Sequence, residues 1–193
     1  MTDTRARLLD ATRRCIGANG LAGTTSRDIA SSADANLAAI TYHFGSKEEL
    51  VAQALLEGLR AWLAPTIEVL GTDTDPAVRA ALAIQTLTAT FQEQKQDASG
   101  YLQALIEAPR IQPLHDGVIR LWAELRSLLA AQMTQMQDRG ELDGWVDPDA
   151  MAGVLVAVAN GLVLHVTVDP GGPALEDMVG QFGSLLLGAH HTR

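Results

Sequence analysis

The side chains whose types and spacing could do chemistry gather between residues 24 and 50. Tyr42 and His43 are neighbours, and both can donate a hydrogen bond to an anionic oxygen. Thr25, Ser26 and Lys47 lie at the starts of predicted helices, where free backbone N–H groups and the helix dipole favour an anion such as phosphate. The chemistry that this set favours is phosphate binding.

Two short predicted helices carry most of these residues. Thr25 and Asp28 match the S/T-x-x-acid capping box of a helix over about residues 26–32. Asn36 is a good N-cap for a second helix over about residues 37–43. A turn of three or four residues joins them, as in a helix-turn-helix, whose second helix can enter a DNA major groove.

Other function classes are compatible with a well-capped helix pair. Many helical proteins contain such a pair without binding DNA, so a dimeric interaction or ligand-binding module is the alternative. Candidate acids and bases for an enzyme are Glu107, His115, Asp116 and Glu124. The sequence lacks a Ser-His-Asp order, a Gly-rich phosphate loop, an H-E-x-x-H motif and metal-ligand spacing. We therefore expect no enzyme, no cofactor and no metal site.

Helical periodicity runs through almost the whole chain, and no convincing strand pattern appears. Predicted helices cover about residues 5–17, 26–32, 37–43, 47–70, 76–96, 99–108, 114–139, 148–168 and 174–188. Asp75-Pro76 and Asp147-Pro148 each pair an N-cap with a first helical residue. Pro65 is expected to kink or end its helix, because it has no N–H and clashes with the preceding turn. The sequence therefore predicts an all-α fold.

The charge of the chain is unevenly distributed. The sequence has 14 Lys and Arg against 23 Asp and Glu, and this net charge of −9 argues against a general nucleic-acid binder. Residues 1–50, however, hold six basic and six acidic residues, so the rest of the chain carries the whole excess of acid. We expect a small, electrically balanced DNA-binding part that depends on local phosphate contacts.

Residues 151–168 form the most apolar segment and are free of formal charge. A membrane-spanning helix needs about 20 predominantly apolar residues and usually has positive flanks. This segment is marginal in length and is flanked by Asp149 and Asp169. We therefore expect a helix that is covered partly by its own domain and partly by another subunit. The charged start of the chain and the single Cys15 favour a cytoplasmic protein.

The N-terminal residues resemble the DNA-binding domain of the TetR (tetracycline repressor) family of transcriptional regulators. The matching residues are Leu8-Leu9-Asp10-Ala11, Gly20, Thr24-Thr25-x-Arg27-Asp28-Ile29-Ala30 and Ile40-x-Tyr42-His43-Phe44-Gly45-Ser46-Lys47-Glu48-Glu49-Leu50. The resemblance covers about residues 5–60. Asp34 replaces the usual Gly, Leu37 replaces a residue that is often polar or basic, and Thr41 replaces a frequent Tyr, so direct base contacts would be fewer than in many relatives.

The resemblance implies a DNA-binding domain over residues 1–50, with its motif at about 25–44. Phosphate contacts would come from Thr25, Ser26, Tyr42, His43 and Lys47, and base-facing positions would be Asn36, Leu37, Ala38, Ala39 and Thr41. Arg27 is the further residue expected to contact DNA. Leu37 and the alanines would contact thymine methyl groups. One short reading helix binds weakly, which favours a homodimer on a palindromic operator.

The resemblance also implies that residues 51–193 form a helical ligand-binding and dimerisation domain. A pocket for an unknown small-molecule inducer would be lined by Phe91, Tyr101, Gln103, Leu105, Trp122, Leu125, Leu129, Met133 and His165. The alternative is core packing, with His165 a buried, hydrogen-bonded histidine. The dimer interface would include Gly153, Ala157, Gly161, Leu175, Met178, Phe182 and Leu186. Inducer binding would release the operator, so we expect a repressor.

Overall fold

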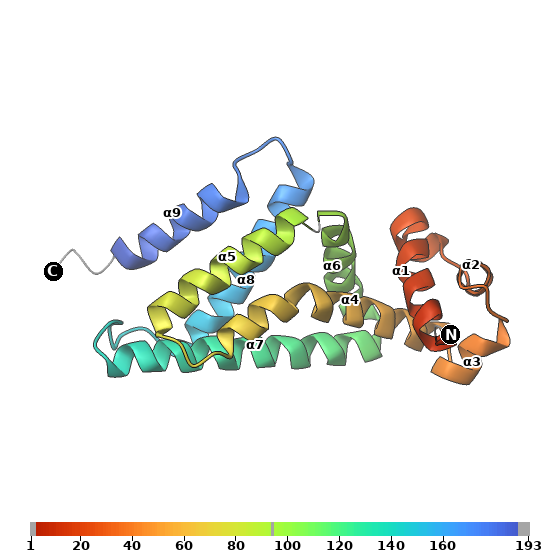
Figure 1. Ribbon diagram of the computed structural model, residues 1–193, viewed down its shortest axis with the longest axis horizontal. Coiled ribbons are helices and arrows are strands. Elements are labelled where there is room, and N and C mark those ends of the chain that lie inside the picture. The colour runs from red at the N-terminus through yellow and green to blue at the C-terminus, as the bar shows by residue number, and fades with distance from the viewer. Residues whose placement is uncertain (1–2, 94, 189–193) are drawn as a thin grey trace. The chain divides into compact units, whose positions relative to one another are not determined.

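The computed structural model describes residues 3–93 and 95–188, and within these residues it contains helices and turns but no strand (Figure 1). The α-helices are α1 (Thr4–Gly23), α2 (Ser26–Ser32), α3 (Ala38–Phe44), α4 (Lys47–Leu70), α5 (Pro76–Glu93), α6 (Lys95–Glu107), α7 (Gln112–Asp138), α8 (Pro148–Val168) and α9 (Leu175–Gly188), with a 3₁₀ turn at Ala108–Arg110. The predicted all-α fold is confirmed.

The two Asp-Pro sequences begin helices as predicted. Asp75 accepts hydrogen bonds from the N–H of Ala77 at 3.0 Å and of Val78 at 3.3 Å, in front of α5. Asp147 accepts bonds from Asp149 at 3.0 Å and from Ala150 at 3.1 Å, in front of α8. In both cases the carboxylate satisfies N–H groups that have no partner within the helix.

Two helix boundaries differ from the predicted ones by four residues or more. Gly20 has φ 68° and interrupts α1, but a further helical turn follows it up to Gly23. Helix α6 begins at Lys95 and not at Ser99, because none of residues 95–98 is a helix breaker. Helix α4 has the predicted bounds, Lys47–Leu70, and Pro65 lies inside it without ending it.

The chain divides into two compact units. Unit 1 comprises Met1–Trp62 and Ser99–Arg120, and unit 2 comprises Leu63–Ala98 and Leu121–Arg193. In unit 1, α6 joins the N-terminal helices through the rings of Trp62 and Tyr101, whose centroids are 4.6 Å apart. The unit therefore extends beyond the helix-turn-helix, and a functional boundary after residue 50 stays a prediction.

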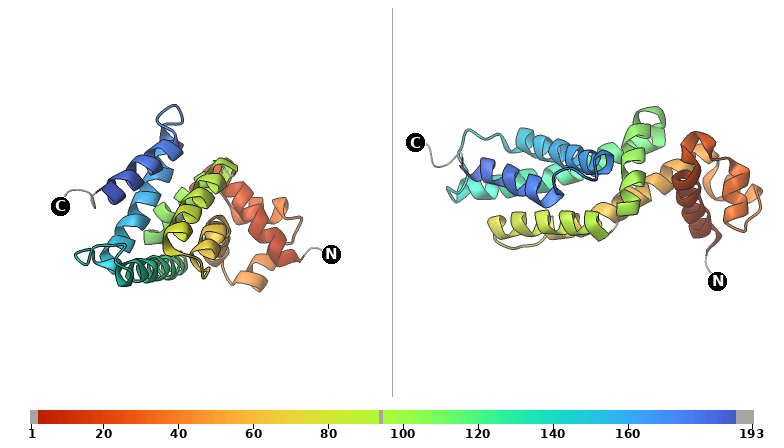
Figure 2. Two further views of the ribbon diagram at one scale, coloured as in Figure 1. Left: turned by 60° about the vertical axis from the view of Figure 1, so that its left-hand side comes forward. Right: turned by 90° about the horizontal axis from the view of Figure 1, so that it is seen from above.

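Unit 2 is built mainly from α5, α8, α9 and the C-terminal part of α7. Helix α9 packs against α8 and α5, and a short connection over residues 169–174 joins it to α8 (Figures 1 and 2). Arg79 is buried in this unit and donates to the Thr72 carbonyl and to Oε1 of Gln135, both at 2.6 Å. These bonds tie α5 to α7.

Helix α8 is apolar and yet largely uncovered by the described part of the chain. It is long and apolar enough to cross a membrane by length and composition, and only 11% of its most apolar 18-residue window is buried. The described residues therefore leave a large apolar surface of α8 uncovered.

Candidate nucleic-acid interface

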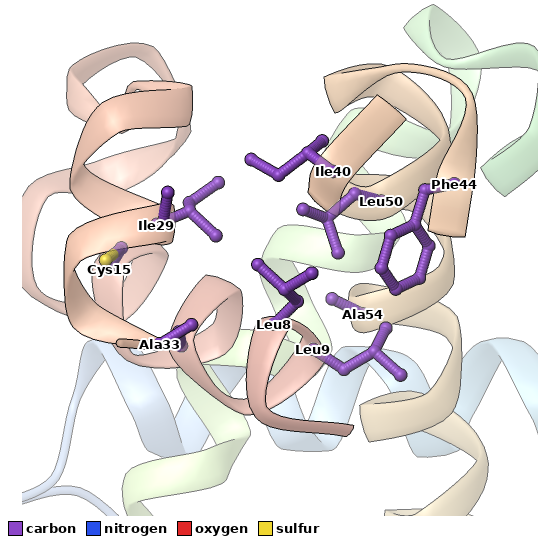
Figure 3. Packing of buried hydrophobic residues seen from close by; sticks show 11 residues of the cluster. Leu8, Leu9, Cys15, Ile29, Ala33, Ile40, Phe44, Leu50 and Ala54 are labelled. Carbon is purple, nitrogen blue, oxygen red and sulfur yellow. The ribbon is translucent and has the colours of Figure 1, made fainter. Parts of the chain in front are cut away.

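A small apolar core holds the N-terminal helices together. Its residues come from α1, α2, α3 and the start of α4, and they are Leu8, Leu9, Ala11, Cys15, Ile29, Ala30, Ala33, Ile40, Phe44, Leu50 and Ala54. In Figure 3, Ile29 of α2, Ile40 of α3 and Leu50 of α4 point toward one another and toward Leu8 of α1. This packing fixes the angle at which α3 presents its opposite face to solvent.

Helix α2 begins with the predicted capping box, which is complete. The Asp28 N–H donates to Oγ1 of Thr25 at 3.2 Å, and the Thr25 N–H donates to the Asp28 carboxylate at 2.9 Å. The Thr25 hydroxyl also donates to this carboxylate, at 2.6 Å. The bond from the Thr25 hydroxyl, which has the larger effect, and the bond from the Thr25 N–H lower the pKa of Asp28 below its usual value of 3.8. Within this structure the Thr25 hydroxyl proton is thus engaged by Asp28.

The substitution Asp28→Asn is expected to lower the melting temperature of the protein by a few degrees at pH 7. Because folding lowers the pKa of Asp28, its stabilising contribution is fully present above pH 3.8 and is lost as the pH falls through the lowered pKa. Circular dichroism melting curves at pH 7 and at pH 3 should therefore give a smaller difference between the two proteins at pH 3. Asp73→Asn, in the exposed α4–α5 connection, is the control; an equal effect from it would contradict the prediction.

The turn between α2 and α3 contains a left-handed residue. Asp34 has φ 46°, and its N–H donates to the Ser31 carbonyl at 3.1 Å. Aspartate adopts this conformation more readily than most residues other than glycine, which explains how it replaces the usual Gly. The Asp34 carboxylate is exposed and lies 3.8 Å from the Arg7 guanidinium of α1.

The start of α3 is organised by Asn36. Its Oδ1 accepts a hydrogen bond from the Ala38 N–H at 2.9 Å, and the helix begins at Ala38, one residue later than predicted. Leu37 and Ala38 are exposed, as is Thr41 one turn later. Ala39, in contrast, is partly buried and packs against the core. It therefore has less surface to offer to a base than was expected.

The end of α3 presents an aromatic pair. Tyr42 is 85% exposed, and its ring lies edge-on to the His43 ring with centroids 4.9 Å apart. His43 is half-buried, and its ring centroid is 6.3 Å from that of Phe44. The Arg5 guanidinium covers the Phe44 ring at 5.4 Å and donates to Gln53 at 2.8 Å. The Tyr42 hydroxyl is therefore well placed to reach a ligand in solvent.

Lys47 connects two of the predicted contact regions. Its Nζ donates to the carbonyl of Thr24, next to the start of α2, while Lys47 itself is the first residue of α4. An ammonium has three donors, so this bond leaves others for an anion. Ser26 is half-buried and Arg27 is exposed on α2. The structure thus gathers the starts of α2 and α4 around one lysine.

The residues predicted to line a ligand pocket are divided between the two units. Tyr101, Gln103 and Leu105 belong to unit 1, whereas Phe91, Trp122, Leu125, Leu129, Met133 and His165 belong to unit 2. Phe91, Leu125 and Met133 are buried, so core packing accounts for them. His165 is exposed, which contradicts the expectation of a buried histidine. The reason is that this side of α8 has no neighbour in the described part of the chain.

A shallow depression of about 500 Å³ lies in unit 2, between α7 and the start of α8. It is lined by Ala123, Arg126, Ser127, Ala130, Ala131, Thr134, Pro148 and Asp149. None of these residues was predicted to line a pocket. Except for His165, the helical spacing of the predicted residues identified buried or half-buried positions, but it carried no information on which helix faces leave space for a ligand.

Sequence reasoning missed Trp62 as a candidate ligand-contacting residue. Its side chain is buried, yet the indole N–H donates to no group among the described residues. Its ring packs on Tyr101, and burial raises the pKa of the Tyr101 hydroxyl well above its usual value. The helical spacing of Leu55, Leu59 and Trp62 could have indicated burial, but it could not reveal an unpaired donor.

The residues predicted for a dimer interface lie on α8 and α9. Gly153 is half-buried, Ala157 and Gly161 are exposed, and Met178 and Phe182 are half-buried. Leu175 is already buried in its own unit and has little surface to give to a partner. The side chain of Leu186 lies outside the described residues.

Models of known protein families match both the N-terminal and the C-terminal part of the chain. The family model described as "Bacterial regulatory proteins, tetR family" matches residues 8–54, and the one described as "BetI-type transcriptional repressor, C-terminal" matches residues 76–187. The HTH-type transcriptional regulator TtgR of Pseudomonas putida is 46% identical over 57 residues. That match covers 30% of this chain and only 27% of the relative's length.

Solved structures resemble the whole chain. A TetR transcription regulator from Haloarcula marismortui ATCC 43049 has a TM-score of 0.80 at 23% identity and covers 98% of both chains. A putative transcriptional regulator from Saccharomonospora viridis, solved in complex with choline, has a TM-score of 0.79 at 22% identity. That likeness covers 100% of this chain and 98% of the other. At these identities the resemblance establishes the fold alone.

Proposed function

Because the chain belongs to the TetR family of transcriptional regulators and carries that family's helix-turn-helix DNA-binding domain, we propose that it is a ligand-responsive repressor that binds a palindromic operator as a homodimer. A small molecule bound by its C-terminal helical domain releases the operator. The observation that carries this proposal is the exposed face of α3, with Tyr42 accessible to solvent and Lys47 beside it at the start of α4. It acts in the cytoplasm, with access to the chromosome.

We assign affinity for the DNA backbone to Thr25, Ser26, Arg27, Tyr42, His43 and Lys47. The Tyr42 hydroxyl and the free N–H groups of Lys47 can donate to phosphate oxygens as the molecule stands. The Thr25 hydroxyl proton is bound to Asp28, so a phosphate contact from it requires this bond to be given up or shared. Phosphate contacts supply affinity and register without reading sequence.

We assign dimerisation to the uncovered face of α8, with Met178 and Phe182 of α9 beside it. The exposed residues of α8 include Val154, Ala157, Gly161, Leu164 and Val168. They recur at alternating intervals of three and four residues, the spacing of a helix–helix seam. Ala157 and Gly161 occupy its middle, where small side chains allow two helices to approach closely. A second copy of α8 fits this stripe better than lipid does, because family members are DNA-binding dimers.

Dimerisation makes operator binding strong enough to regulate. A single short recognition helix contacts few base pairs, whereas a two-fold dimer places two such helices on half-sites a helical turn or more apart. A ligand that prefers one separation of these helices shifts the equilibrium by its difference in affinity for the two states. Helix α4, which carries Lys47 at its start, is the proposed coupling element.

We place the ligand against the buried aromatic residues of unit 1. Trp62 offers an indole N–H without a partner among the described residues, next to Tyr101. Of the other residues predicted to line the pocket, Gln103 and Leu105 lie in the same unit. An apolar wall with a few polar groups is the usual character of a small-molecule site.

Selection of bound duplexes from a random DNA pool tests the proposed function. We expect enrichment of a palindromic sequence and a complex of two chains per duplex, measured by light scattering. Enrichment of an asymmetric sequence, or of none, would contradict the proposal.

Ligand-induced release of the operator needs a separate test. Small molecules that raise the melting temperature of the protein are identified first, with choline as the first probe, and operator affinity is then measured with and without them. Equal operator affinities with and without the bound ligand would contradict ligand-induced release.

A further inference from the structure

The start of α3 presents carbon atoms to solvent where a recognition helix meets base edges. Leu37 is 46% exposed, and Ala38 is exposed beside it. Residues 36–44 contain no Lys, Arg, Gln, Asp or Glu. Because the N-terminal residues of a recognition helix approach the bases most closely, Leu37 and Ala38 occupy the positions that decide sequence preference.

The polar residue at this end of the helix is partly committed to the fold. Asn36 uses its Oδ1 to accept the Ala38 N–H at 2.9 Å. An asparagine that reads adenine needs both amide atoms at once, the oxygen for N6–H and the nitrogen for N7. The bond from Ala38 uses one of the two lone pairs of Oδ1 and fixes the direction of the amide, so a bidentate contact to adenine would have to share Oδ1 with the backbone of α3.

The remaining side chains restrict what α3 can recognise. Guanine is read chiefly by Arg or Lys, and cytosine by a carboxylate, and residues 36–44 provide neither. The major-groove feature that an apolar side chain recognises is the C5 methyl group of thymine. Ala39 packs against the core, which leaves Leu37 as the large apolar side chain at this surface.

We propose that α3 recognises thymine through its C5 methyl group, that Leu37 is the specificity-determining residue, and that Ala38 allows the close approach. This inference rests on the proposed operator binding and adds the chemical feature that the operator must contain. Each half-site then holds a thymine against Leu37. Arg27 lies on α2, so any guanine contact from it would add to methyl recognition without replacing it.

Replacing thymine by deoxyuridine tests the inference, because the two bases differ only in the C5 methyl group. The selected operator is synthesised with one thymine at a time replaced symmetrically in both half-sites, and affinity is measured by fluorescence anisotropy. Burying one methyl group is worth about fourfold in an equilibrium constant, and one in each half-site about 15-fold. We expect this loss at one symmetric position and smaller changes elsewhere.

Variants of Leu37 identify the side chain that contacts the methyl group. Leu37→Ala should bind the thymine and uracil operators equally, whereas Leu37→Met, which keeps an apolar side chain of similar size, should retain the preference for thymine. Leu37 is exposed and lies outside the core, so neither change should alter the melting temperature. Tyr42→Phe is the control; it should weaken binding to both operators alike, because a phosphate contact does not read the base.

The possible results distinguish a failure of methyl recognition from a failure of operator binding. Equal affinity of the unaltered protein for every uracil-substituted operator would overturn methyl recognition and leave operator binding intact. Retention of the thymine preference in Leu37→Ala would overturn the assignment to Leu37. If the random pool yields no enriched duplex, the proposed function itself fails.

Discussion

Gly161→Glu is expected to separate the dimer and to abolish specific operator binding at concentrations where the unaltered protein is saturated. The substitution places two like charges in the middle of an apolar helix–helix contact. Like charges brought together across an interface cost several kcal/mol, which corresponds to about 100-fold or more in the dissociation constant. Sedimentation equilibrium measures the dimer, and fluorescence anisotropy measures operator binding.

The fold of the single chain should tolerate this change. Gly161 is exposed, and a Cβ added to it meets no atom within 4 Å. Glutamate is also a better helix former than glycine by several tenths of a kcal/mol. Gly100→Glu is the matched control, because Gly100 is an exposed helical glycine of α6 with equally open space. A Gly161→Glu protein that remains dimeric would contradict the assignment of α8 to the interface.

The helices of this protein could be predicted because their ends are determined by neighbours in sequence. The Thr25–Asp28 capping box and the Asp75 and Asp147 caps involve side chains within a few residues of the backbone groups that they bind, and the interruption at Gly20 follows from the positive φ that glycine adopts without strain. Local rules left open whether Pro65 would kink or end its helix, and the structure continues α4 through it to Leu70.

The candidate site was predictable in its residue types and less so in its geometry. The sequence indicates that Thr25 and Asn36 carry oxygen atoms suitable for caps, but only the structure gives the resulting constraint on each. Ala39 and Leu37 are two residues apart at the start of α3, and the packing of the N-terminal core decides which of them is exposed. Trp62 meets Tyr101 across 39 positions of sequence, a pairing that no local pattern encodes.

Tyr42→Phe combined with Lys47→Gln is expected to weaken DNA binding by about 10,000-fold or more at physiological salt. A hydrogen bond to a charged group contributes about 1.5–3 kcal/mol, and the dimer would lose contacts in both subunits. Losing one lysine–phosphate contact in each subunit should also make the slope of log K against log salt less steep by about 2. The loss should be the same for operator and random DNA, because phosphates do not report sequence. Anisotropy titrations at several salt concentrations measure both quantities.

The choice of substitutions separates a lost phosphate contact from a disturbed fold. Lys47 also donates to the Thr24 carbonyl, so Lys47→Ala would change the support of α2 as well as the charge. Glutamine can keep a donor to that carbonyl while it removes the charge, and Lys47→Arg keeps both. Tyr42 is 85% exposed, so Tyr42→Phe removes a hydroxyl from solvent and not from the core. If the salt slope of Lys47→Gln equalled that of Lys47→Arg and of the unaltered protein, Lys47 would support α2 without contacting a phosphate. The phosphate contact of Tyr42 is then tested with Tyr42→Phe alone.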